Sequence, residues 1–100
     1  MFFIILVRDK PDMLERRIAH RPAHVEYWAA QNDVVKVAGA MLASDAPDAT
    51  PIGSSFLIEA ADEAAARALI AADPFTTEGI FSDDVTVQPV RPAIGVWRPA

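Results

Sequence analysis

Residues Phe2–Val7 form the segment that most limits how this chain can fold. All six side chains are apolar, most are β-branched or aromatic, and the charged residues Arg8–Lys10 end the run. A short apolar run of this kind predicts a strand that is buried on both faces. No basic segment precedes it and no small-residue cleavage site follows it, so we do not expect a signal peptide. The chain has 100 residues, which predicts a single domain over 1–100, with 91–100 as a C-terminal tail.

Pro22 limits where the first helix can begin. A proline inside a helix costs about 3 kcal/mol, whereas the first helical position tolerates it. We therefore predict a main helix from Pro22 to about Asn32, preceded by a short helical turn that Asp12 caps and that extends through Arg17. His24 then lies in the first turn of the main helix, where the partial positive charge of the helix end favours the neutral imidazole.

The rest of the sequence alternates between strand and helix signals. The predicted elements are a strand at Val34–Leu42, a loop at Ala43–Gly53, a strand at Ser54–Ala60, a helix at Glu63–Ala72 capped by Asp62, and a strand at Asp84–Val90. The order βαββαβ predicts an α+β, ferredoxin-like fold with one antiparallel four-stranded sheet.

This fold leaves one face of the sheet without a cover. Both helices pack on the same face, yet Phe2–Val7 is apolar at every position. Water is a poor cover for such a surface. We therefore predict a homodimer in which two copies pack through this sheet face.

Composition excludes several classes of function. Fourteen acidic and nine basic residues give a net charge of −5, which disfavours binding to nucleic acid and to anionic membranes. The absence of cysteine excludes disulfides, thiol catalysis and cysteine-ligated metals. No apolar run is long enough to span a bilayer, so we expect a cytoplasmic protein.

Several short motifs carry a family resemblance. They are Arg17, the run Arg21-Pro22-Ala23-His24, Gly39-Ala40, Gly53-Ser54 and Asp73-Pro74-Phe75. Their order and spacing resemble the YciI-like (YCII-related) family of the dimeric α+β barrel superfamily, from Phe2 to about Val90. The resemblance implies a ferredoxin-like dimer with a small cleft around a His–Asp pair, here His24 and Asp73. A relative in this family is a dehydrochlorinase that acts on a chlorinated hydroxyhydroquinone, and muconolactone isomerases are similar in fold.

His24 and Asp73 are the candidate catalytic residues. If the fold brings them together, the carboxylate would fix the imidazole tautomer and increase the basicity of the other ring nitrogen. Such a histidine can act as a general acid or base without a cofactor. The alternatives are that His24 is a surface residue of a helix and that Asp73 is an ordinary N-cap for a turn starting at Pro74.

Four further residues are candidates for binding a small-molecule substrate: Arg17, Arg21, Ser54 and Phe75. The arginines can pair with a carboxylate or phenolate, or they can be solvated near Asp12 and Glu15. Ser54 can offer a cleft hydroxyl or be a plain strand residue. An aromatic residue such as Phe75 is commonly part of a core.

His20 and His24 have a spacing that could bind a metal on one helix. Pro22 is expected to place them in different segments, and no third ligand is evident. We therefore expect neither a metal nor a cofactor.

Two hypotheses for function follow. The first is a cofactor-independent enzyme, of dehydrochlorinase or isomerase type, that acts on a small hydroxylated or chlorinated aromatic substrate with a His24–Asp73 acid/base pair. The second is a non-catalytic ligand-binding or accessory protein that has the same cleft.

Overall fold

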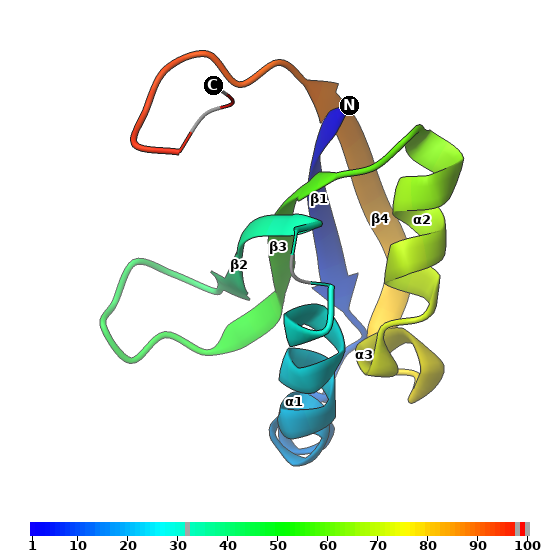
Figure 1. Cartoon of the computed structure of the whole chain (residues 1–100). Coiled ribbons are helices and arrows are strands. Elements are labelled where there is room, and N and C mark those ends of the chain that lie inside the picture. The colour runs from blue at the N-terminus through cyan, green and yellow to red at the C-terminus, as the bar shows by residue number, and fades with distance from the viewer. Residues whose placement is uncertain (32, 98, 100) are drawn as a thin grey trace.

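The computed structural model describes residues 1–31, 33–97 and 99. Its elements in chain order are β1 (Phe2–Asp9), α1 (Leu14–Ala29), β2 (Val35–Leu42), β3 (Pro51–Glu59), α2 (Glu63–Ala71), α3 (Pro74–Thr77) and β4 (Phe81–Val90) (Figure 1). The predicted α+β, ferredoxin-like arrangement is confirmed, with a one-turn helix α3 added between α2 and β4. The four strands form one antiparallel sheet in the order β2-β3-β1-β4.

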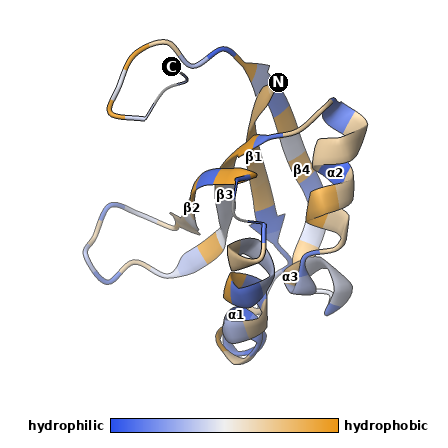
Figure 2. Ribbon diagram, viewed as in Figure 1, coloured by the Kyte–Doolittle hydropathy of each residue, from blue (hydrophilic) through white to orange (hydrophobic). Residues whose placement is uncertain are grey.

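The core lies between the sheet and the helices, which lie on one side of it (Figure 1). In the central strand β1, Phe3, Ile5 and Val7 are buried in this core. Ile4 and Leu6 alternate with them and are 42% and 41% exposed. The prediction of a strand buried on both faces is therefore wrong for the single chain, because every second side chain points to the face without helices. In Figure 2, the orange colour of hydrophobic residues marks parts of β1 and parts of α2.

The first helix does not begin at Pro22. Helix α1 begins at Leu14 and continues through Pro22 to Ala29, and the predicted end at Asn32 lies outside the described residues. Pro22 removes one backbone hydrogen bond, to the carbonyl of the residue four positions earlier. That residue is Ile18, and both Ile18 and Pro22 are exposed, so the lost bond lies on the solvent side of the helix. The free-energy cost of the proline is offset by the packing of the opposite side of the helix, where Arg17 and Trp28 are buried.

This longer helix corrects three details of the prediction. Met13, not Asp12, is the N-cap of α1, and it makes no side-chain capping bond. Asp12 instead has a left-handed backbone conformation, with φ of 59°. His24 lies in the middle of α1, so the helix-end charge does not act on it, and His20 is on the same helix.

The remaining boundaries are close to the predicted ones. Asp62 caps α2 as expected, with its side chain accepting a hydrogen bond from the Ala65 amide. Strand β3 begins at Pro51, inside the predicted loop, and β4 begins at Phe81. Within the described part of the tail, the Trp97 ring packs edge-on against Phe2, with 5.3 Å between ring centroids.

No helix in the described residues is long and apolar enough to cross a membrane. The cytoplasmic location stays a prediction of the sequence.

Candidate functional site

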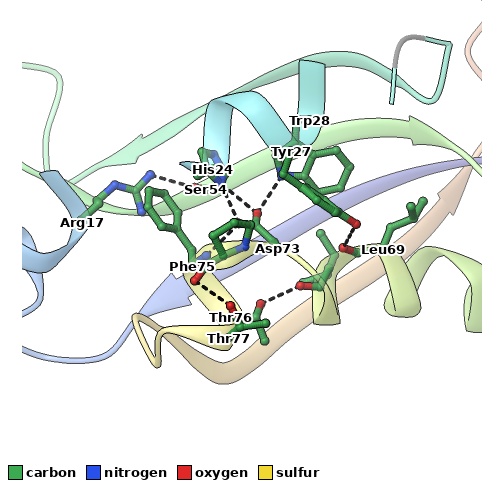
Figure 3. A network of polar contacts seen from close by, with 12 residues as sticks. Arg17, His24, Tyr27, Trp28, Ser54, Leu69, Asp73, Phe75, Thr76 and Thr77 are labelled. Atoms are coloured by element: carbon green, nitrogen blue, oxygen red, sulfur yellow. Dashed lines mark hydrogen bonds and ion pairs between the residues drawn. The ribbon is translucent and has the colours of Figure 1, made fainter. Parts of the chain in front are cut away.

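Asp73 is the centre of a buried network of hydrogen bonds (Figure 3). Its side chain is fully buried and accepts hydrogen bonds from three donors. The Phe75 amide donates to Oδ1 at 2.8 Å and Trp28 Nε1 donates to Oδ2 at 2.7 Å. His24 Nδ1 lies 2.9 Å from Oδ1 and 2.8 Å from Oδ2. One fixed donor thus holds each oxygen, and the imidazole approaches both.

This arrangement defines the protonation pattern of His24. Both oxygens of Asp73 are acceptors, so Nδ1 carries the shared hydrogen and Nε2 has a free lone pair in the neutral ring. Nε2 has no hydrogen-bond partner among the described residues and is not one of their buried unpaired atoms. It is therefore open to the cleft that His24 lines. The ring is stacked on Phe75, with 4.0 Å between centroids and 9° between planes.

Local sequence explains how the three donors reach one carboxylate. Asp73 precedes Pro74 and caps α3, so it also has the ordinary N-cap role considered as an alternative. His24 and Trp28 are four residues apart on α1 and therefore lie on the same side of that helix. The packing of α1 against α3 joins these two local features.

Arg17 belongs to a second buried group next to the first (Figure 3). Its Nη1 atom donates to both carboxylate oxygens of Asp9, at 3.0 and 3.1 Å, and its Nη2 atom donates to Ser54 Oγ at 2.7 Å. The guanidinium carbon lies 4.7 Å from the centre of the Phe75 ring. The alternative of a solvated Arg17 near Asp12 and Glu15 is therefore wrong, since only 7% of its side chain is exposed.

Burial raises the pKa of Asp9 above its ordinary value, and the charge and hydrogen bonds of Arg17 lower it in part. Asp9 is not one of the site residues predicted from the sequence. The signal was present, because Asp9 continues the alternation of Phe3, Ile5 and Val7 and thus shares their buried face.

A close backbone approach places Ser54. Gly53 lies beside β1 at a point where a Cβ atom would overlap the carbonyl oxygen of Val7, so a larger residue does not fit without a shift. Ser54 follows it, is 2% exposed and bonds to Arg17. Ser55 is on the opposite side, where its hydroxyl donates to the Gly39 carbonyl.

Next to this network is a cleft of about 510 Å³. Residues of α1 line it at helical spacing, and the polar or aromatic ones among them are Arg17, Arg21, His24 and Trp28. The cleft is also lined by Phe75 of α3 and by Ala38–Ala40 of β2. The structure thus brings all six sequence candidates into one region: Arg17, Arg21, His24 and Phe75 line the cleft, and Ser54 and Asp73 contact them from below its surface.

Trp28 is a polar participant that the sequence analysis assigned only to the core. Its ring does pack in the core, but its N–H also holds Asp73. The neighbouring Tyr27 donates its hydroxyl hydrogen to the Leu69 carbonyl at 2.7 Å. Burial raises the pKa of Tyr27, and the negative charge of Asp73 raises it further.

His20 does not join His24 in a metal site. Its Nε2 atom lies 3.6 Å from a carboxylate oxygen of Glu78. Among the described residues, no group of three or more potential ligands could hold a metal ion.

Comparison with known proteins gives relatives that match most of this chain. The chain is 34% identical over 96 residues to Protein YciI of Escherichia coli O6:H1, a match that covers 91% of this chain and 97% of the relative. Protein YciI of Shigella flexneri matches to the same extent.

A solved structure is also similar. It is a 5-chloro-2-hydroxyhydroquinone dehydrochlorinase from Burkholderia phenoliruptrix in complex with 2,5-dihydroxybenzoquinone. The TM-score is 0.84 at 26% identity, and the match covers 93% of this chain and 96% of the other. In addition, residues 1–91 match the family model of the YCII-related domain. The chain therefore belongs to the YCII-related domain family.

Proposed function

We propose that this protein is a cofactor-independent enzyme in which His24 acts as a general acid or base and Asp73 holds its tautomer. The observation that carries the proposal is the contact of His24 Nδ1 with a fully buried carboxylate while Nε2 is open to a cleft. A histidine oriented in this way can take a proton from a bound molecule at Nε2.

The substrate that we propose is a small hydroxylated or chlorinated aromatic compound. A cleft of about 510 Å³ is in the range of small-molecule sites. The His24 ring stacks on the buried Phe75 ring and offers an aromatic contact to a bound ring, while Arg17 and Ser54 hold the adjacent wall in place. The similarity to the dehydrochlorinase supports this choice of substrate class.

The proposed reaction is the loss of hydrogen chloride. The substrate reacts as its keto tautomer, in which one hydroxyl proton has moved to the ring carbon that bears chlorine. His24 Nε2 then removes the proton of a second hydroxyl group, the O–H electron pair forms a new carbonyl, and the adjacent ring double bond shifts to the carbon that loses chloride. The carbon–chlorine bond breaks with its electron pair, so that chloride leaves and the proton remains on the imidazole until solvent takes it. The step needs no oxidant, reductant or metal, because one proton and one chloride account for everything that is lost.

Substitution of His24 tests this proposal. With 5-chloro-2-hydroxyhydroquinone as the probe, we expect His24→Gln to slow chloride release by about 100-fold or more, the usual contribution of a general acid or base. His20→Gln is the matched control on the same helix and should leave the rate unchanged. Equal rates in wild type and His24→Gln, with both folded, would favour a ligand-binding protein instead. A wild type that releases no chloride would refute the dehydrochlorinase assignment.

We also propose that the protein is a homodimer that buries the exposed sheet face. Ile4, Leu6 and Val37 are 42%, 41% and 58% exposed, which is a large apolar surface for a single small domain. We expect Leu6→Lys to shift the mass measured by sedimentation from dimer to monomer. Leu14→Lys, which is equally exposed at 41% but lies on α1, should leave the dimer intact. A monomeric wild type would rule out the dimer.

A further inference from the structure

The charged side chains that line the cleft around His24 are opposite in sign to the net charge of the whole chain. Among the described residues, the charged or titratable side chains that line it are Arg17, Arg21 and His24, and no aspartate or glutamate does so. The chain itself has 14 acidic and 9 basic residues and a net charge of −5. A local excess of one sign in a cleft favours ligands of the other sign.

A larger hollow, of about 660 Å³, lies against α2 and β4 and does not have this property. Lys10 and Arg67 line it together with Asp83, so both signs are present. Arg67 is also paired with Glu63 at 2.9 Å. This hollow therefore contains a carboxylate and an arginine that is already paired, whereas no carboxylate lines the His24 cleft.

The two arginines of the His24 cleft are not equivalent. Arg17 donates to Asp9 and to Ser54, and its charge is compensated by the Asp9 carboxylate. Arg21 is exposed and makes no ion pair or hydrogen bond with the described residues. A free guanidinium keeps its full set of five donors for a ligand, and its flat fork matches two oxygens of a carboxylate.

Helical geometry places Arg21 beside His24 on the cleft side of α1. Arg17, Arg21 and His24 are four and three residues apart on α1, so Arg21 lies on the same stripe and close to His24. The remainder of the lining is mainly apolar, with Leu14, Ile18 and Val25 at the surface.

We propose that the cleft selects an aromatic anion, and that Arg21 is the residue that determines this selectivity. A ring oxyanion, carboxylate or phenolate, pairs with the Arg21 guanidinium, while the ring lies in the apolar part of the cleft beside His24. This inference rests on the proposed function, because it concerns the ligand of the same cleft. Arg17 does not bind the anion; it stabilises the cleft wall through its bonds to Asp9 and Ser54.

A matched pair of ligands tests the inference without turnover. The probes are 2,5-dihydroxybenzoate, which is ionised at neutral pH, and its amide, which has nearly the same shape and no charge. In titrations followed by calorimetry, we expect wild type to bind the acid about tenfold more tightly than the amide, the usual effect of one charge-assisted contact. Arg21→Gln should remove this difference, and Arg21→Lys should restore part of it.

Arg16→Gln is the control, because Arg16 is exposed on the same helix but pairs with Glu78 outside the cleft. It should keep the tenfold preference for the acid. Equal binding of acid and amide by wild type, an undiminished preference in Arg21→Gln, or no saturable binding of the acid at millimolar concentration would each overturn the inference.

The same titration with His24→Gln separates the inference from the proposed function. The variant should still prefer the acid, because the ionic contact is with Arg21. If His24→Gln also keeps wild-type turnover, the catalytic proposal fails while the anion selectivity stands.

Discussion

Replacing Asp73 with alanine is expected to lower the free energy of unfolding by about 3 to 5 kcal/mol, because the change leaves several buried donors without an acceptor. The Phe75 amide, Trp28 Nε1 and His24 Nδ1 all donate to this one carboxylate. Its side chain is fully buried, so water cannot replace the lost acceptor without a rearrangement. Urea denaturation of wild type and variant measures the difference.

Asp62→Ala is the matched control for this change. Asp62 is also the N-cap of a helix, but it is exposed and accepts one hydrogen bond, from the Ala65 amide. Its removal should cost about 1 kcal/mol. If the two alanine variants lose the same stability, the network around Asp73 contributes no more than an ordinary cap.

Asp73→Asn keeps the shape of the side chain and gives a second readout. The negative charge of Asp73 raises the pKa of Tyr27, so its removal should lower that pKa. Tyr27 is the only tyrosine in the sequence, and the absorbance of tyrosinate therefore reports on it alone. If the pKa of Tyr27 stays unchanged in a folded Asp73→Asn variant, the negative charge of Asp73 does not act on Tyr27 and the prediction is wrong.

The second large effect is expected for Arg17→Met, with a loss of about 3 to 5 kcal/mol at neutral pH, because it leaves the Asp9 carboxylate buried without its partner. The side chains of Arg17 and Asp9 are each only 7% exposed. Methionine fills much of the same volume, so the loss comes mainly from the charge and hydrogen bonds.

The loss in Arg17→Met should depend on pH in a defined direction. Burial already raises the pKa of Asp9 in the folded protein above its ordinary value of 3.8, and the loss of Arg17 removes the charge and hydrogen bonds that lower it most. A raised folded pKa for an acid means that the folded state holds the proton more tightly, so stability falls as the pH rises from the ordinary value through the raised one. The difference between variant and wild type should therefore shrink in acid and reach its maximum above the raised pKa.

Arg16→Met is the control for this prediction. Arg16 is the residue directly before Arg17 and faces Glu78, with side chains 50% and 44% exposed. Such pairs contribute about 0 to 1 kcal/mol. Adding Asp9→Leu to Arg17→Met should recover part of the stability, since it removes the unpaired buried charge. A double variant that is no more stable than Arg17→Met would argue against this cause.

The errors in the predicted elements have a common physical origin. Pro22 suggested a helix start because proline is unfavourable inside an isolated helix, yet the tertiary packing of α1 and the exposed position of Ile18 make the interior position tolerable. For Arg17 the sequence left open whether it binds a substrate anion or is solvated near Asp12 and Glu15. Its actual partners, Asp9 and Ser54, come from two strands whose pairing the local sequence does not specify.

The sequence by itself determined the order of the elements, the antiparallel sheet and the caps at Asp62 and Asp73, because apolar periodicity and capping residues act within a few positions along the chain. It also selected His24 and Asp73 as a pair through the family resemblance. Only the tertiary structure decided that Trp28 and Phe75 complete the shell around Asp73, that Arg17 is neutralised by Asp9, and that Arg21 is left free. These contacts join residues from separate elements, and their distances depend on how α1 and α3 pack on the sheet.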